Sequence, residues 1–333
     1  MFSRCECSPI LGLALATFVL AGSIVDVCDG AEMEHTASLY NGVLRAVVAD
    51  NELYGDRHQP GYNGVSELYL GLADQMNLFV PLYAGLNFEH IFSGDSTSYD
   101  WHIFEPRRAP MRLIRGSTNR VELLQERTEH WPLRSRLVYE FQQDAIDFAY
   151  SGTPLADAWK KNGYVGVFFA SYINAPEDLA IQFIGRSRPS RGDPQPRWIK
   201  HVPPSHGVAA CHRPAGSAWE PPFDGNFPIG LVSGISDFEY VYPFYFGRYG
   251  ERVFVMMFER PGKGGELRFA HSPNGAGPGN PAWDFVYFQR DYAVNREFRF
   301  RARAVYRKFK GLDEVVRLYE TWSGERVNVP AVN

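Results

Sequence analysis

The chain has 333 residues, of which 45% are hydrophobic and 15% aromatic, and its formal net charge is −4. This composition is typical of a globular protein and lacks the basic excess that nucleic-acid binding normally needs. The sequence contains neither a P-loop nor the glycine-rich fingerprint of dinucleotide binding. We therefore expect no nucleic-acid partner and no cofactor.

The N-terminus has the pattern of a targeting segment. Arg4 precedes an apolar run from Ile10 to Val25, and small residues occur around Ala21–Ser23 and at Gly30-Ala31. The run is shorter than the roughly 20 residues of a membrane-spanning helix. We predict a signal peptide over residues 1–30 and a secreted or periplasmic chain without stable membrane insertion. A retained single anchor is the alternative.

Cysteine usage agrees with export. Cys5 and Cys7 lie in the predicted signal peptide, Cys28 lies near its end, and Cys211 stands alone. We expect a domain that is held by its core and not by a disulfide framework. A Cys28–Cys211 bridge requires that cleavage leaves Cys28 in place.

Alternating or apolar runs between turn residues predict a β-rich domain. The predicted strands are 40–50, 65–72, 120–127, 133–141, 145–150, 163–173, 180–186, 229–235, 240–246, 252–258, 267–270, 283–289 and 298–307. The run 163–173 is apolar throughout, which indicates a central strand buried on both faces. Residues 154–161 predict a short helical turn. The Pro-rich stretch 186–228 is irregular, and a loop of that length is usually functional or disordered. Its tryptophans and histidines favour order.

The last predicted strand alternates strictly, as a half-buried antiparallel strand does. One face carries Phe298, Phe300, Ala302, Ala304 and Tyr306, and the other carries Arg299, Arg301, Arg303 and Arg307. The arginines suit an acidic polysaccharide, but a solvated face paired with acids on neighbouring strands is the interpretation we favour. One helix follows, since Leu312, Val315, Val316, Tyr319 and Trp322 share a helical face and Gly324 marks its end.

With its layout and the stretches HQPGYNGV, FVPLYAGLNFEHIF, FEPRRAPM and GNPAWDF, the chain resembles exported bacterial members of the galactose-mutarotase-like superfamily. The resemblance implies a large antiparallel β-supersandwich whose concave face binds sugar. It also implies an acid histidine in a motif of the type His-x-Tyr-Phe-Asn, followed late in the chain by a glutamate base. Here the matching stretch is Ala170-Ser171-Tyr172-Ile173-Asn174. The histidine position is Ala170, which puts aldose epimerisation in doubt.

Two groups of residues are candidates for proton transfer. The first is His201, His206, Cys211 and His212, whose spacing matches no standard zinc pattern, so we expect loop packing and no metal. His206 is the preferred histidine, because Gly207 permits close backbone approach. The second group comprises Glu89, His90, Trp101, His102, Glu105, Arg107 and Arg108. Paired carboxylates suit glycoside chemistry and the whole group suits sugar binding; a salt bridge from Glu105 to Arg107 or Arg108 is the alternative.

A third group surrounds the glycine-rich loop 272–281 and contains His271, Asn274, Asn280, Trp283 and Asp284. Polar and aromatic residues on a loop between strands are typical of a binding rim. The alternative is turn chemistry for the asparagines, with Trp283 in the core.

The sequence thus predicts one all-β domain over residues 31–333 that binds a mono- or oligosaccharide. His206 or His90 would move protons, with Glu105 or Glu89 as the carboxylate partner. The predicted substrate-binding residues are Trp101, Arg107, His201, His271, Asn280 and Trp283. The alternatives are a non-catalytic envelope protein that binds glycans or serves as a scaffold, and a polysaccharide lyase with a histidine or tyrosine base, in which Arg107 neutralises a uronate carboxylate. Nothing in the sequence indicates an oligomeric state.

Overall fold

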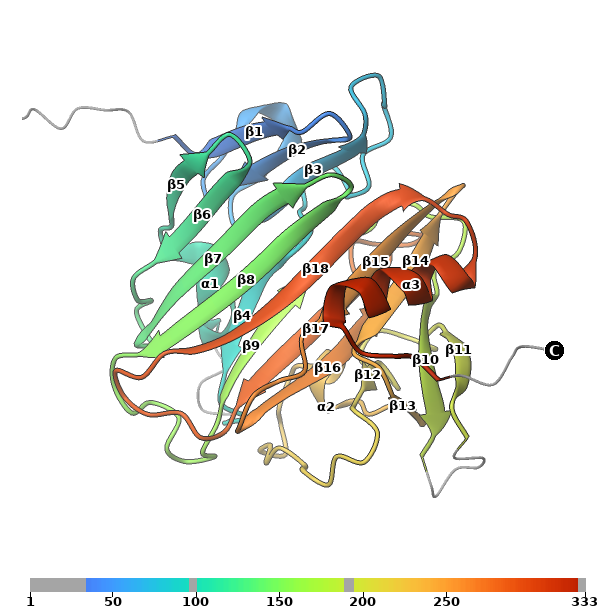
Figure 1. The fold of residues 1–333 in the computed structure, drawn as a ribbon. Coiled ribbons are helices and arrows are strands. Elements are labelled where there is room, and N and C mark those ends of the chain that lie inside the picture. Colours follow the sequence, from blue (N-terminus) through green and yellow to red (C-terminus); the bar gives the residue numbers. More distant parts are fainter. Residues whose placement is uncertain (1–33, 96–100, 189–194, 329–333) are drawn as a thin grey trace, which may run out of the picture. The chain divides into compact units, whose positions relative to one another are not determined.

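A computed structural model describes residues 34–95, 101–188 and 195–328, which form three antiparallel sheets and a few helices (Figure 1). The largest sheet has ten strands in the order β11-β10-β14-β15-β18-β8-β7-β6-β5, with β13 also paired to β10. Its strands are β5 (Arg112–Ser117), β6 (Arg120–Gln125), β7 (Leu133–Gln142), β8 (Ala145–Pro154), β10 (Ile181–Ser187), β11 (Arg197–His201), β13 (Phe238–Tyr240), β14 (Phe244–Tyr249), β15 (Arg252–Phe258) and β18 (Phe298–Lys308).

The second sheet has five strands in the order β12-β16-β17-β9-β4, and the third has three in the order β1-β2-β3. Their strands are β4 (Asn87–Phe92), β9 (Val165–Ala170), β12 (Cys211–His212), β16 (Gly265–Ser272), β17 (Ala282–Gln289), β1 (Thr36–Tyr40), β2 (Leu44–Ala49) and β3 (Gly64–Leu70). The helices are α1 (Glu105–Arg108), α2 (Gly230–Ser233) and α3 (Leu312–Ser323), with the 3-10 turns η1 (Gly55–Arg57) and η3 (His102–Phe104).

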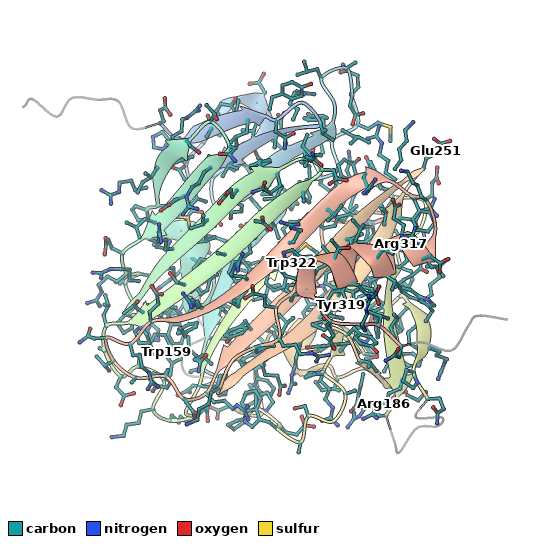
Figure 2. All side chains as sticks on the ribbon, in the orientation of Figure 1. Trp159, Arg186, Glu251, Arg317, Tyr319 and Trp322 are labelled. Atoms are coloured by element: carbon teal, nitrogen blue, oxygen red, sulfur yellow. The ribbon has the colours of Figure 1, made fainter. Side chains whose placement is uncertain are left out.

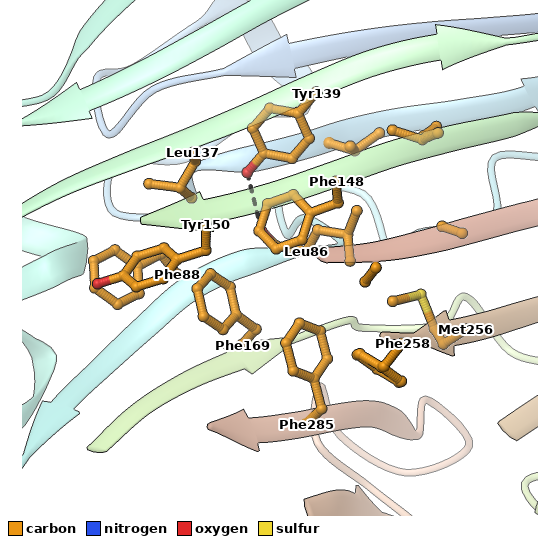
Figure 3. Packing of buried hydrophobic residues seen from close by; sticks show 14 of the residues in the cluster. Leu86, Phe88, Leu137, Tyr139, Phe148, Tyr150, Phe169, Met256, Phe258 and Phe285 are labelled. Carbon is orange, nitrogen blue, oxygen red and sulfur yellow. Dashed lines mark hydrogen bonds between the residues drawn. The ribbon is translucent and has the colours of Figure 1, made fainter. Parts of the chain in front are cut away.

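The ten-stranded and five-stranded sheets pack face to face on a core rich in phenylalanine (Figure 3). Phe169 on β9 stacks on Phe285 of β17 at 5.1 Å between ring centroids, and Phe148 on β8 meets Phe169 edge-on at 5.4 Å. Aromatic side chains bury large apolar areas, so these contacts are a main stabilising term. The predicted antiparallel β-sandwich is confirmed. The predicted double burial of 163–173 holds for residues 164–173, which are all buried, whereas Gly163 is exposed.

The C-terminal helix is confirmed as well. α3 packs on the outer face of the ten-stranded sheet, where Tyr319 meets Phe244 at 4.8 Å and Val315 is buried beside it (Figure 2). Gly324 follows the helix with φ of 73°, a left-handed conformation that glycine adopts without a Cβ penalty.

The arginine stripe of β18 is the paired surface that we favoured. The alternate residues Phe298 to Tyr306 enter the core, whereas Arg301, Arg303 and Arg307 point outward. Their side chains pair with Glu259 at 2.9 Å, Asp147 at 2.7 Å and Asp144 at 3.0 Å, respectively. Acids on neighbouring strands and turns therefore supply the partners, and no glycan is needed to explain the stripe.

Two local predictions are wrong. Residues 229–235, predicted as a strand, contain helix α2, in which Gly230 packs directly on the backbone of Gly207, and only Ile235 forms a β-bridge, with Cys211. A short apolar run does not distinguish the two structures by itself. Residues 154–161 form no helix; β8 extends through Pro154, and the Leu155 N–H donates to Pro132 O at 2.7 Å.

Several boundaries also differ from the predictions. The predicted strand 40–50 is divided by a turn in which the Asn41 side chain accepts from the Leu44 N–H at 2.8 Å. The predicted strand 240–246 is divided between β13 and β14, and the irregular stretch 186–228 contains β11 and β12. Such boundaries depend on pairing partners that are distant in sequence.

Within the described ranges, no helix is long and apolar enough to cross a membrane. The predicted signal peptide and Cys28 lie outside the described residues. Cys211 is buried on β12, and burial raises the pKa of its thiol to about 11.

Candidate functional site

A β-bulge places two adjacent polar residues on the same side of strand β4. Phe88 pairs with Phe169 and His90 pairs with Phe168, so Glu89 is an extra residue in the ladder. Since a bulge interrupts the alternation of side chains, Glu89 and His90 both lie opposite the sandwich core that contains Phe88. The five-stranded sheet thereby acquires a carboxylate and an imidazole on the face turned away from that core.

The Glu89 carboxylate is the centre of a buried polar network. The Tyr172 hydroxyl donates to Glu89 Oε1 at 2.8 Å, and Arg107 Nη1 donates to the same oxygen at 3.1 Å. Arg107 also donates from Nε to Gly61 O at 2.7 Å and lies 3.8 Å above the Tyr62 ring. A charge-assisted bond together with stacking fixes this guanidinium more firmly than either contact alone.

Burial shifts the pKa of two neighbouring groups upward. Asp284 on β17 accepts the Ser171 N–H at 2.9 Å through Oδ1, whereas Oδ2 is buried without a partner among the described residues. Burial, with Glu89 nearby, raises the pKa of Asp284 well above its usual range. Burial also raises the pKa of Tyr172, and the Glu89 carboxylate adds to the shift. Both shifts favour the protonated form of the side chain.

Two histidines flank the network. His90 is buried between Phe104 and Phe168, with ring centroids at 4.5 and 5.2 Å, and burial lowers its pKa to about 4. It is therefore neutral at pH 7. His206 is exposed, and its Nδ1 lies 2.9 Å from Ser272 Oγ on β16. Because the charge of His206 also acts on the pKa of His90, the two rings are electrostatic neighbours.

The outer part of the site is formed by residues on or beside helix α1 and the preceding 3-10 turn, namely Trp101, Phe104, Arg107 and Arg108. Pro106 occupies the first turn of α1, where a missing N–H costs nothing. Phe104 and Arg107 are three residues apart and point the same way, and Arg107 lies 5.8 Å from the Phe104 ring. Arg108 lies 4.4 Å from the ring of Trp101, whose side chain is 65% exposed.

A cavity of about 530 Å³ opens at this outer part. It is lined by Asn51, Glu52, Pro60, Gly61, Trp101, Phe104, Arg107 and Arg108. Tyr62 and Tyr83 lie beside it, half-buried, with their rings 4.7 Å apart. We call this surface the arginine–aromatic groove.

Glu105 belongs to a different set of contacts. Its carboxylate accepts the Thr128 hydroxyl, the backbone N–H of His130 at 2.9 Å and a ring N–H of His102 at 2.9 Å. Burial raises the pKa of Glu105, but these hydrogen bonds outweigh it and hold the pKa below the usual value. The alternative salt bridge to Arg107 or Arg108 is wrong, because Arg107 pairs with Glu89.

Replacing Glu105 with glutamine is expected to lower the free energy of unfolding by about 1–3 kcal/mol at pH 7, since buried donors lose their charged acceptor. Because the pKa of Glu105 is lower in the folded than in the unfolded chain, its ionised carboxylate stabilises the fold at pH values above the unfolded-state pKa of 4.5. This stabilisation is lost as the pH falls through the folded-state pKa. The difference from wild type should therefore shrink near pH 3. Urea unfolding at both pH values measures it, with exposed Glu129→Gln as the control. If Glu105→Gln and Glu129→Gln change the free energy of unfolding equally, the hydrogen bonds of the Glu105 carboxylate do not stabilise the fold.

The remaining predicted residues lie elsewhere. Trp283 is fully buried in the sandwich core, with its indole N–H donating to Leu179 O at 3.2 Å, so the core alternative is the arrangement found. Asn280 accepts the Ala175 N–H at 2.9 Å and serves the turn. His201 and His271 lie together on the other side of β16 from Ser272.

The structure thus brings Glu89, His90, Arg107 and His206 into one neighbourhood and adds residues that the sequence argument did not select. Tyr172 carried a signal, because it is the tyrosine of the motif quoted above. Asp284 appeared only as a member of the loop group. Tyr62 and Tyr83 carried no signal, since their importance depends on Arg107 from a distant segment.

No family model matches the chain, and the search of curated proteins gave no match. Among solved structures, a galactose mutarotase-like protein from Lactobacillus casei aligns with a TM-score of 0.43 and 10% identity over 82% of this chain and 100% of that one. A galactose mutarotase related enzyme from Lactobacillus acidophilus aligns with a TM-score of 0.39 and 9% identity over 83% and 100%. A heparan sulfate lyase from Pedobacter heparinus aligns with a TM-score of 0.39 and 9% identity over 84% of this chain but 38% of its own.

The class that the fold defines is a large antiparallel β-sandwich with a C-terminal helix. At these identities and TM-scores the likeness extends no further than the fold.

Proposed function

We propose that this protein binds a carbohydrate in the arginine–aromatic groove. The observation that carries the proposal is the pairing of arginine and aromatic side chains there: Arg107 lies over Tyr62, and Arg108 lies over exposed Trp101. A sugar ring has an apolar face that stacks on aromatic rings and hydroxyls that accept from guanidinium groups. The volume of about 530 Å³ suits a small ligand.

The test is a binding screen against neutral and anionic oligosaccharides. It uses the protein in the form that the producing cell yields after any N-terminal cleavage. A ligand of the native state raises the midpoint of thermal unfolding. We expect a rise with one class of sugar, reduced in Trp101→Ala. If folded protein shows no rise with any glycan, the carbohydrate proposal fails and an envelope scaffold becomes the better account.

A second function, acid–base chemistry on the bound sugar, is supported by the titratable groups near Glu89 and His90. His90, whose pKa burial lowers to about 4, could serve as a base, and Asp284, whose pKa burial raises, could serve as an acid. Exposed His206 adds a second imidazole. In a lyase, Arg107 would neutralise a uronate carboxylate and a histidine would remove the proton. Tyr172 would supply a proton, since its raised pKa disfavours the base form.

Replacing His206 with alanine separates these functions. For an enzyme we expect turnover to be abolished while the Kd for the sugar changes by less than about fivefold, because one exposed hydrogen bond contributes about 1 kcal/mol. Turnover and Kd are measured on the sugar identified by the screen. Unchanged turnover in His206→Ala would remove this residue from the chemistry, and absence of turnover in wild type would leave a binding protein.

We also propose that the chain is exported after removal of residues 1–30, on the basis of the N-terminal pattern. N-terminal sequencing of protein recovered outside the cytoplasm should begin near Ala31. Recovery of an intact N-terminus would contradict export by cleavage.

A further inference from the structure

Three histidine side chains meet between the two packed sheets. His201 ends β11, His212 lies on β12, and His271 lies on β16. One ring nitrogen from each lies within 4.8 Å of the other two. His212 and His271 are fully buried and His201 is half-buried. β11 belongs to the ten-stranded sheet, whereas β12 and β16 belong to the five-stranded sheet, so the cluster joins the two layers.

Each buried ring has one nitrogen fixed by a backbone carbonyl. His271 Nε2 lies 3.0 Å from Leu179 O, and His212 Nδ1 lies 3.3 Å from Phe238 O. A carbonyl oxygen accepts only from a protonated nitrogen, so the other nitrogen of each ring carries a lone pair. A backbone carbonyl that sets the tautomer in this way is the usual outer partner of a metal-ligating histidine.

One nitrogen of each ring has no hydrogen-bond partner in the described part of the chain. These buried atoms are His201 Nδ1, His212 Nε2 and His271 Nδ1. A buried polar atom without a partner costs about 1–3 kcal/mol, and three in one place require an explanation. A shared ion would satisfy all of them at once.

Burial lowers the pKa of all three histidines and so favours their neutral form. The Asp237 carboxylate is close enough to act on His201 and would offset part of the charge of a cation.

We propose that His201, His212 and His271 bind a divalent transition-metal ion, for which Zn²⁺ is the best fit. All three donors are imidazoles and none is a carboxylate, which disfavours Mg²⁺ and Ca²⁺. Three histidines with water in the fourth position is an established zinc arrangement. Zn–N bonds of about 2.0–2.1 Å would draw the rings closer together than they are here.

The ion would act as a clamp between the sheets and not in the proposed sugar chemistry. Successive residues of a strand face opposite sides, so His271 and Ser272 point apart, and Ser272 is the residue that contacts His206. Two phenylalanine rings border the cluster. The ring centroid of Phe183 lies 4.7 Å from that of His212, and the ring centroid of Phe238 lies 5.7 Å from that of His201. The spacing of the histidines in the sequence does not reveal this site, because the third ligand, His271, comes from a strand distant in sequence.

The test is zinc binding by the full chain after chelator treatment. Competition with a chromophoric chelator should give one Zn²⁺ per chain, and saturating Zn²⁺ should raise the midpoint of thermal unfolding by at least about 3 °C. Co²⁺ should give the intense visible absorption of a four-coordinate site. Absence of stoichiometric zinc binding by folded wild-type protein would overturn the proposal.

Variants assign the ligands. His201→Gln is the main one, because this half-buried side chain is the easiest of the three to replace without unfolding, and we expect zinc affinity to fall at least tenfold. His271→Gln should behave likewise, and circular dichroism confirms that each variant is folded. His206→Gln is the matched control, on the other side of β16, and should bind zinc as wild type does. Equal affinity of His201→Gln and His206→Gln would refute the assignment.

Discussion

Replacing Arg107 with alanine is expected to lower the free energy of unfolding by about 3 kcal/mol and to abolish sugar binding. The guanidinium is 18% exposed and its partner Glu89 is 9% exposed, so the variant leaves a carboxylate in a largely dry site. Removing one member of a buried ion pair costs about 3–5 kcal/mol, mainly because the remaining charge is uncompensated. The Tyr62 ring also loses the cation above it.

Two further variants make this prediction specific. Arg107→Ala combined with Glu89→Gln should recover part of the lost stability, because the unpaired charge is gone, yet should not restore binding. Arg108→Ala should change stability by less than about 0.5 kcal/mol, as exposed substitutions usually do. Urea unfolding and the glycan thermal-shift assay provide both readouts. An Arg107→Ala protein as stable as Arg108→Ala would show that the buried network contributes little.

The second large effect concerns Trp283, which the sequence analysis predicted to bind substrate, as it did Trp101. Trp283→Ala is expected to lower the free energy of unfolding by about 3–5 kcal/mol, the usual cost of truncating a fully buried tryptophan. Its ring fills the space over Gly247, where an added Cβ would lie 2.2 Å from the indole. The fraction that remains folded should bind sugar as wild type does.

Trp101→Ala should show the opposite pattern. The side chain is 65% exposed and contacts Arg108, so stability should change by less than about 0.5 kcal/mol. Sugar affinity should fall at least tenfold, as expected when a stacking tryptophan is lost from a binding surface. If Trp283→Phe, a milder core variant, weakens binding as much as Trp101→Ala in folded protein, the groove is misassigned.

Local periodicity was enough to predict much of the scaffold. The alternation of Phe298 to Tyr306 with arginines identified β18, its buried face and its outward charges, because a strand exposes successive residues on opposite sides. The spacing of Leu312 to Trp322 likewise identified α3 and its apolar face. These patterns show which side of a helix or strand faces the core, and they can be read without knowing which element packs against it.

The site depended on partners that a linear pattern does not reveal. The bulge that turns Glu89 and His90 to one side arises from the pairing of β4 with β9, and Arg107 reaches Glu89 only because α1 packs beside that strand. Trp283 packs over Gly247 of β14, a strand distant in sequence, and is fully buried in the sandwich core. The sequence by itself predicted the sandwich, most of its strands and its final helix. Tertiary packing alone decided which side chains converge, since contacts between distant segments set burial, pKa and access together.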